Sequence, residues 1–199
     1  MHPFFLEEWR EPLPVELRQA LRAHGRLRAV GEIGLDFYDG RGDQARQVGA
    51  LAAQLGVAQE LGLPVILHNR KSWSEFFGVL RDLKLGTMRG VCHHFTGSIE
   101  IARQALDWGL YLSFCGPLTY PKARRLKEAA RFVPLDRMLT ETDAPDLPPA
   151  RYTGGLSLPY HVGEVVSELA VLKGMAPEEI AAQVERNFLA LLGLDGGSG

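Results

Sequence analysis

Short apolar runs alternate along the chain with longer segments in which apolar residues recur at helical spacing. Four of the runs end in a polar side chain: 29–31 before Glu32, 64–67 before His68, 89–92 before His93 and 137–142 before Asp143. A fifth run covers 110–115. Continuous apolar runs of this length, with helical patterns between them, are typical of strands in a parallel sheet. The pattern therefore predicts about five parallel strands.

Helices are predicted between and after these runs, over about 14–23, 43–61, 72–85, 98–109, 122–131, 160–173 and 177–192. In the segment from 43 to 61, apolar residues fall on one stripe of a helix. Ser72 and Glu75 have the spacing of a capping box, and Ser98 is suited to cap the helix that follows it. One helix for each strand is the order of an α/β fold.

This order predicts a TIM-type (β/α) barrel that is incomplete at its N-terminus. A closed barrel has eight strands and ~250 residues, whereas about five strands are recognisable in this chain of 199 residues. We expect a single domain over 1–194 and a flexible tail over 195–199. Open barrel edges leave backbone groups unpaired, so we also expect self-association through those edges.

Composition narrows the class of protein. A net charge of −2 gives no overall attraction to polyanions, so nucleic-acid binding would have to come from a local patch or from bound metal. The two cysteines lie inside apolar runs and are interpreted as reduced core residues. We see no signal peptide, and no apolar run approaches the ~20 residues that a membrane span needs. We therefore expect a cytoplasmic protein that does not enter a membrane.

The polar residues at the ends of the runs are the candidate chemistry. In a parallel barrel the active site lies at the carboxyl ends of the strands, which would bring together Glu32, His68, His93 and Asp143. Tens of residues separate them, which is too far for a local metal-binding loop but suits successive strand ends. Carboxylate and imidazole are ligands for divalent metals, here Zn²⁺ or Mn²⁺ by ligand softness, or Mg²⁺ as in many nucleases.

Four blocks around these residues resemble the signature blocks of the TatD-family metal-dependent deoxyribonucleases. They are Gly-Glu-Ile-Gly-Leu-Asp at 31–36, Pro-Val-Ile-Leu-His-Asn-Arg at 64–70, His-His-Phe-Thr-Gly-Ser at 93–98 and Glu-Thr-Asp-Ala-Pro at 141–145. The blocks occur in the family's order and at about its spacing, and the resemblance covers nearly the whole chain. It implies a barrel of the metal-dependent hydrolase kind that hydrolyses DNA phosphodiesters with two divalent metal ions.

The resemblance also implies roles for individual residues. Glu32 would bridge the two metals, and His68 and His93 would hold one of them. Asp143 would lie by the other metal and orient or deprotonate the attacking water, which makes Glu32 and Asp143 the catalytic residues. Arg70, two residues after His68, would bind substrate phosphate. Two metals ~3.5–4 Å apart can activate a water and stabilise the leaving oxygen of an in-line displacement.

The sequence departs from the family pattern in two places. The family opens with a His-x-His pair whose imidazoles hold the metal near Asp143, and none of the six histidines here forms that pair. Instead, His2 and Pro3 match a block at the end of the third family strand. We expect a fragment or a wrongly assigned start, in preference to an open half barrel or two chains that complete each other. Leu-Ser-Leu-Pro at 156–159 replaces an Asn-Glu-Pro-like element of the family.

Three other residues carry weaker expectations. On a strand, His94 would point to the opposite face from His93 and serve as a core or rim residue. His2 would lie at the barrel rim without a defined role. Asp36 would order the loop after Glu32 from outside the set of metal ligands.

Two other functions fit the same residues. A metal-dependent amidase or lactonase on the same barrel would direct the same activated water at a carbonyl carbon. Many such enzymes bridge their metals with a carboxylated lysine, and the Gly31–Glu32 pair argues against that here. A degenerate barrel that binds metal or a partner without turnover would account for the missing His-x-His pair. Turnover separates the three hypotheses. A nuclease hydrolyses phosphodiesters, an amidase or lactonase hydrolyses esters or lactams, and a degenerate barrel hydrolyses neither.

Overall fold

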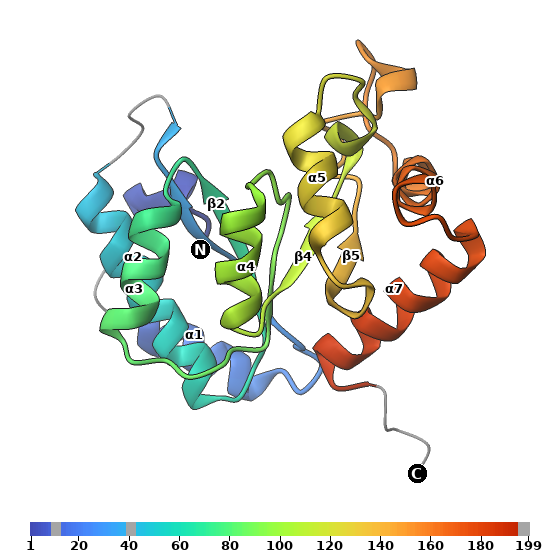
Figure 1. The fold of residues 1–199 in the computed structure, drawn as a ribbon. Coiled ribbons are helices and arrows are strands. Elements are labelled where there is room, and N and C mark those ends of the chain that lie inside the picture. Colours follow the sequence, from blue (N-terminus) through green and yellow to red (C-terminus); the bar gives the residue numbers. More distant parts are fainter. Residues whose placement is uncertain (9–12, 39–42, 195–199) are drawn as a thin grey trace. The chain divides into compact units, whose positions relative to one another are not determined.

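The structure, a computed structural model, describes residues 1–8, 13–38 and 43–194 of the chain (Figure 1). Its contacts separate two compact units, Met1–Val91 (unit 1) and Cys92–Gly199 (unit 2). Each unit contains a parallel pair of strands on which helices pack, so both are built in the same β/α manner.

Unit 1 opens with a short 3₁₀ helix and continues with alternating helices and strands. β1 and β2 pair in parallel, with Gly34 opposite His68. The Val65 N–H donates to the carbonyl oxygen of Arg89 at 3.1 Å, so the segment that enters β3 lies beside the start of β2. The elements in chain order are η1 (Pro3–Glu8), α1 (Leu13–Ala23), β1 (Val30–Asp36), α2 (Gln44–Glu60), β2 (Val65–Arg70), α3 (Trp73–Asp82) and β3 (Gly90–Cys92), which reaches the boundary with unit 2.

β1 is longer than predicted because two glycines lie inside the strand instead of ending it. The pairing with β2 shifts register around Gly31. A Cβ at Gly31 would lie 2.6 Å from the Cβ of Ile66, and a Cβ at Gly34 would lie 1.8 Å from the carbonyl oxygen of His68. Glycine is required where two chains approach this closely. The prediction that the strand ends at Glu32 is therefore wrong, and Glu32 projects from within β1.

The core of unit 1 lies between its strands and two of its helices. α2 packs on β1, α3 packs on β2, and the two helices lie side by side (Figure 1). Their apolar stripes supply the helical half of the core, as the helical spacing predicted. The largest fully buried side chains of this unit are Ile33, Leu35, Leu51, Leu55, Leu67, Phe76 and Leu80.

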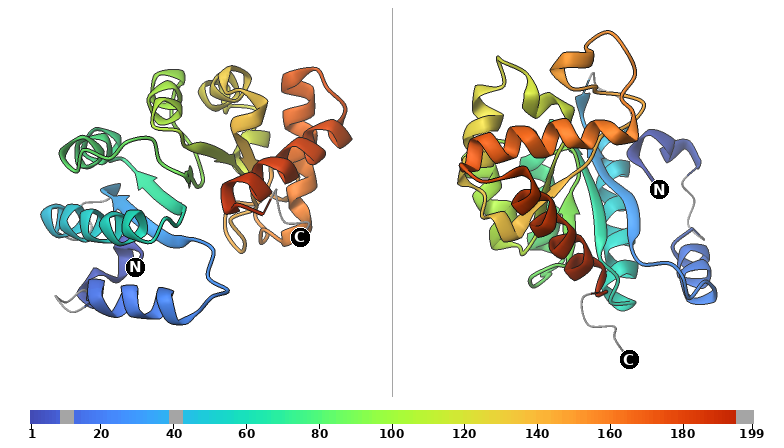
Figure 2. Two further views of the ribbon diagram at one scale, coloured as in Figure 1. Left: turned by 90° about the horizontal axis from the view of Figure 1, so that it is seen from below. Right: turned by 90° about the vertical axis from the view of Figure 1, so that its right-hand side faces the viewer.

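Unit 2 continues the alternation and ends in two long helices. β4 and β5 pair in parallel, and the Phe95 N–H donates to the Ser113 carbonyl oxygen at 2.9 Å, which places the segment after β3 beside β4. Figure 2 shows α6, in orange, next to α7, in red. The elements are α4 (Ile99–Asp107), β4 (Tyr111–Phe114), η3 (Gly116–Thr119), α5 (Arg124–Phe132), η4 (Leu135–Arg137), β5 (Met138–Thr140), η5 (Ala150–Tyr152), η6 (Pro159–His161), α6 (Val162–Lys173) and α7 (Pro177–Leu192).

The two predicted helix caps have different outcomes. The Ser98 side chain accepts the Ile101 N–H at 3.4 Å, so this cap is confirmed. Ser72 does precede α3, but its hydroxyl donates to the carbonyl oxygen of Leu35 and to Asn69 Oδ1 at 3.1 Å. It makes no capping bond, so the predicted capping box is wrong. The hydroxyl instead ties the start of α3 to both strands of unit 1.

The predicted α/β class is confirmed, with five strands and helices between them in the described part of the chain. Cys92 and Cys115 are free, buried thiols, as expected of reduced core residues. Among the described residues, no helix combines the length and the apolar character that crossing a membrane requires. The expectations of one domain over 1–194 and of self-association stay predictions, and the expected tail at 195–199 lies outside the described residues.

Candidate metal-binding groups

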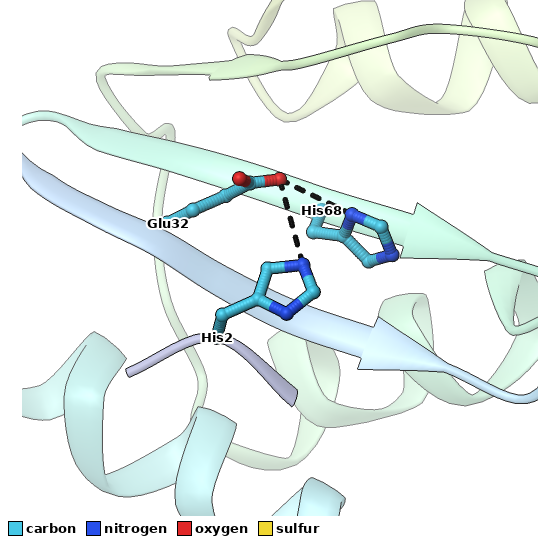
Figure 3. Close-up of side chains that lie close together, drawn as sticks. All are labelled: His2, Glu32 and His68. Atoms are coloured by element: carbon cyan, nitrogen blue, oxygen red, sulfur yellow. Dashed lines mark hydrogen bonds and ion pairs between the residues drawn. The ribbon is translucent and has the colours of Figure 1, made fainter. Parts of the chain in front are cut away.

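Three side chains of unit 1 converge, and we call them the unit 1 group: His2, Glu32 and His68 (Figure 3). Glu32 Oε1 lies 3.1 Å from His68 Nδ1 and 3.9 Å from His2 Nε2. The rings of His2 and His68 meet edge to face, with centroids 4.5 Å apart. One ligand atom from each residue lies within 4.8 Å of the other two. All three side chains are half-buried, so their ligand atoms are shielded and still accessible.

Neighbouring parallel strands bring two of these residues together. Glu32 projects from β1 and His68 from β2, and these strands are hydrogen-bonded partners. His2 comes from the segment before η1, where the Phe4 N–H donates to His2 Nδ1 at 3.1 Å. β2 continues past His68 to Arg70, so the predicted end of this strand is wrong by two residues.

A buried carboxylate contacts His68 from the side away from Glu32. Asp36 Oδ2 lies 2.9 Å from His68 Nε2, and Asp36 Oδ1 accepts the Tyr38 N–H at 2.9 Å. The Gln47 side chain in α2 fixes the Asp36 backbone, because it accepts the Asp36 N–H at 2.8 Å and donates to the Asp36 carbonyl oxygen at 3.0 Å. Asp36 thus contacts a candidate ligand directly, where the sequence indicated only a role in the following loop.

Arg70, the predicted phosphate ligand, is exposed at the end of β2. Its Cζ lies 3.7 Å from the centroid of the Tyr38 ring. Such a cation–π stack orients a guanidinium without neutralising its charge. The position suits an anion-binding side chain, and the phosphate contact itself stays a prediction.

Unit 2 contains a second set of convergent side chains, which we call the unit 2 group: His93, His94 and Asp143. His93 Nε2 lies 3.9 Å from Asp143 Oδ1, and His94 Nδ1 lies 3.8 Å from Asp143 Oδ2. His94 has a φ of +44°, so the chain turns directly after β3. The strand alternation that predicted His94 on the opposite face does not apply to a turn, and that prediction is wrong.

Glu141 contacts both histidines of the unit 2 group. Its Oε1 lies 3.2 Å from His93 Nδ1 and accepts the backbone N–H of His94. Burial raises the pKa of the Cys115 thiol, and the negative charges of Glu141 and Asp143 raise that pKa further. A thiol with a raised pKa stays protonated at neutral pH, which disfavours Cys115 as a nucleophile in the metal-free protein.

Both groups have a donor set that fits a divalent cation. Each combines imidazole nitrogen with carboxylate oxygen, a mixture that suits Zn²⁺ or Mn²⁺. Each group offers three ligand atoms from the chain. Three protein ligands leave coordination positions for water or substrate, which is the pattern of catalytic rather than structural sites.

The four predicted ligands are all members of the two groups. Glu32 and His68 lie together in unit 1, and His93 and Asp143 lie together in unit 2. The implied sharing of one cation by Glu32, His68 and His93, and the implied bridging by Glu32, stay predictions.

Sequence reasoning did not assign His2, His94 and Glu141 to this chemistry. A signal was available for each of them. His94 directly follows a candidate ligand at a strand end, and Glu141 lies two residues before Asp143, a spacing that can place two side chains on one side of an extended segment. For His2 the signal was the match of His2 and Pro3 to a block at the end of the third family strand, but its approach to Glu32 depends on how the segment before η1 folds back.

Comparisons with known proteins give a consistent result. A family model described as TatD related DNase matches residues 1–193. The uncharacterized metal-dependent hydrolase YcfH of Escherichia coli is 40% identical over 185 residues, which are 93% of this chain and 70% of YcfH. The 3'-5' ssDNA/RNA exonuclease TatD of Erwinia amylovora is 34% identical over 98% of this chain and 76% of its own length.

Solved structures show the same likeness. The crystal structure of YjjV, a TatD homologue from Escherichia coli, matches with a TM-score of 0.90 and 33% identity over 97% of this chain and 74% of YjjV. A TatD-family hydrolase from Entamoeba histolytica matches with a TM-score of 0.81 at 20% identity, over 96% of this chain and 72% of its own. These matches confirm the predicted fold.

Proposed function

This chain belongs to the TatD-related DNase family, and we propose that it hydrolyses phosphodiester bonds of DNA with two bound divalent cations. Its relatives include proteins named as metal-dependent hydrolases. The observation that carries the proposal is the convergence of imidazole nitrogens with carboxylate oxygens in each unit. The name of the Erwinia amylovora relative, an exonuclease on ssDNA and RNA, supports the phosphodiester as the bond attacked.

When bound, a divalent cation supplies an activated water nucleophile and offsets the negative charge of a phosphodiester. In unit 1, Glu32 and His68 would hold it, and His2 lies within reach of the same point. In unit 2, Asp143 and His93 would be the corresponding residues. A carboxylate in each group is important because it offsets the positive charge brought into a half-buried site.

The remaining steps belong to the side chains themselves. The Asp143 carboxylate is 28% exposed, so it can hydrogen-bond a water, orient it and accept its proton. Arg70 presents paired N–H donors that match two oxygens of a phosphate, and the Tyr38 ring holds that guanidinium in place. Arg70 therefore positions the substrate, whereas Asp143 acts on the nucleophile.

The test is hydrolysis of a fluorescent single-stranded oligodeoxynucleotide by the purified chain with Mn²⁺ or Mg²⁺. We expect cleavage that EDTA abolishes and that Glu32→Gln lowers by more than ~100-fold, beyond the range for residues that only support a metal ligand. Glu75→Gln is the matched control, because Glu75 is exposed on α3. Cleavage that persists in EDTA or in Glu32→Gln would overturn the proposal, and turnover of esters or lactams without DNA cleavage would favour a carbonyl substrate.

A further inference from the structure

Two exposed phenylalanine side chains lie directly beside the unit 1 group. Phe4 is 47% exposed and Phe5 is 57% exposed. The rings of Phe4 and His2 meet edge to face with centroids 4.5 Å apart, and the Phe4 centroid is 6.0 Å from that of His68. The Phe5 centroid is 6.2 Å from that of His2. Accessible aromatic surface therefore borders the candidate cation ligands where η1 meets the two strands.

The exposure of these two rings is built into the turn that begins η1. The Phe5 N–H donates to the His2 carbonyl oxygen at 3.0 Å, and the Phe4 N–H donates to His2 Nδ1 at 3.1 Å. Pro3 and Leu6, on either side of the phenylalanines, are buried and anchor the segment. The fold therefore leaves two neighbouring aromatic residues out of its core, and exposed apolar surface that is gathered at one place marks a binding site.

The aromatic rings of unit 1 suit different parts of a nucleotide. The Tyr38 ring stacks with the guanidinium of Arg70, which the proposed function assigns to phosphate. Phe4 and Phe5 bring neither charge nor a polar atom in their side chains, so they suit the flat face of a base, which every base possesses. A base inside a duplex is already stacked between its neighbours and has to leave the stack to reach a protein ring. The two rings therefore fit an unpaired base.

We propose that Phe4 and Phe5 form a stacking platform that holds one unpaired base of a DNA strand beside the unit 1 group. A base held on these rings keeps its adjoining phosphates close to Glu32 and His68, so the platform positions the strand for reaction. The proposal rests on the proposed function in taking DNA as the substrate. Stacking tolerates any base, so we expect the platform to add affinity with little sequence preference.

The first experiment measures affinity for a short single-stranded oligodeoxynucleotide by fluorescence anisotropy in Mn²⁺. Phosphorothioate linkages make its backbone resist hydrolysis, so binding is measured without turnover. We expect Phe5→Ala to weaken binding by about 5-fold or more, the loss of one stacked base, and Phe5→Trp to bind at least as well as wild type. Phe5→Leu keeps apolar volume without a flat ring, so it should resemble Phe5→Ala. Phe188→Ala removes a similarly exposed ring from α7 and is the matched control.

A cycle that combines protein variants with substrate variants identifies the contact as a stack on a base. An abasic nucleotide moved along the oligodeoxynucleotide should lower wild-type affinity most at one position. There the abasic substitution and Phe4→Ala or Phe5→Ala remove the same stack, so their effects should not add. The slope of log K against log[salt] should be unchanged in Phe5→Ala, whereas Arg70→Ala should reduce it by about 0.7, the value for one phosphate contact with a single strand.

Two further readouts separate stacking from a supporting role in the fold or in the unit 1 group. Phe4 contacts both histidine rings of the group, so Phe5 is the sharper position for these controls. Calorimetric Mn²⁺ affinity and the thermal unfolding temperature of Phe5→Ala should stay near the wild-type values, because a substrate contact is lost and nothing else. In the nuclease assay Phe5→Ala should raise KM with kcat nearly unchanged, the pattern for a contact made equally before and during reaction.

Equal affinity of wild type and Phe5→Ala for the intact oligodeoxynucleotide would overturn the proposal, and so would additive losses at every abasic position. Wild-type protein that binds no oligodeoxynucleotide would also overturn it. The proposed function fails in a different way. DNA cleavage with an unchanged KM in Phe5→Ala would leave the nuclease and remove the platform. A stacked base without cleavage would leave the platform and remove the nuclease.

Discussion

The two units orient a histidine by different means. In unit 1, Asp36 is almost fully buried, and Gln47 of α2 fixes its backbone from both sides. In unit 2, Glu141 is a quarter exposed and lies in the segment after β5. The acid beside His68 is therefore buried within its unit, whereas the acid beside His93 is partly hydrated.

The difference follows from where each histidine lies in its strand. His68 is inside β2, and the far side of its ring faces Asp36, whose backbone is fixed by Gln47 of α2. His93 follows the last residue of β3, where the chain turns at His94. The two histidine side chains are buried alike, at 13% and 14% exposed, so the units differ in the acid beside the ring and not in the ring itself. We therefore expect unit 1 to tolerate substitution less well than unit 2.

Loss of the histidines themselves should have the largest effect. His68→Ala and His93→Ala should each weaken Mn²⁺ binding by more than ~100-fold, because a ligand is lost and not only its support. Because the proposed function gives each histidine a cation in its own unit, each single variant should weaken one Mn²⁺ site and the double variant should weaken both. A single variant that weakens both sites in calorimetric titrations would contradict that assignment. His24→Ala, an exposed position after α1, is the control.

Adding one methyl group at a close backbone approach should have the next largest effect. Gly34→Ala would place a Cβ 1.8 Å from the His68 carbonyl oxygen, and Gly116→Ala would place one 2.1 Å from the Leu147 carbonyl oxygen. Neither neighbour is a flexible side-chain end, so each variant should lose about 1–3 kcal/mol of unfolding free energy or more. Urea unfolding measures the loss. Wild-type stability in Gly34→Ala would show that β1 and β2 can move apart. It would then contradict the expectation that unit 1 tolerates substitution less well than unit 2.

The buried thiols predict a smaller effect that depends on pH. Burial raises the pKa of Cys92 from 9.0 to about 12. Between these values the unfolded chain releases a proton that the folded chain retains, so the stabilisation present below pH 9 is lost as the pH rises. The expected loss approaches about 1.4 kcal/mol per pH unit for one such group. Urea unfolding of wild type and Cys92→Ala at about pH 8 and about pH 10 measures it, and equal losses in the two proteins would contradict it.

The smallest expected effect is a gain in stability at open glycines in each unit. A Cβ added at Gly49 in α2 or at Gly163 in α6 would meet no atom within 4 Å beyond its own helix backbone and chain neighbours. Alanine in a helix is favoured over glycine by roughly 0.5–1 kcal/mol, so each variant should unfold at a slightly higher temperature. The pair also serves as the control for Gly34→Ala and Gly116→Ala. A loss of stability at either open glycine would mean that the steric reason given for the close approaches is incomplete.

Much of the fold was predictable because its signals are local. Continuous apolar runs located the strands, and the helical spacing over 43–61 located α2 to within one residue at each end. The end of β1 was not predictable in this way, because Gly31 and Gly34 look like strand breakers in isolation. Their role becomes clear only when the neighbouring strand is in place, since the contact that excludes a Cβ comes from β2.

The candidate site was predictable to a similar depth. Glu32 and His68 lie within neighbouring strands and His93 and Asp143 follow strands closely, so their grouping within each unit follows from the strand pattern. The contacts of Asp36 and Glu141 with the far ring nitrogens were not predictable, because they depend on ring orientation and on burial. Neither ring orientation nor burial can be inferred from the spacing of residues along the chain.

The measurement that tests the two candidate metal-binding groups most directly is a crystal structure of the Mn²⁺-loaded protein with anomalous scattering. We expect one manganese peak next to Glu32 and His68 and another next to His93 and Asp143. Mn²⁺-dependent cleavage of DNA by a protein that shows no manganese peak at either group would contradict the proposed function.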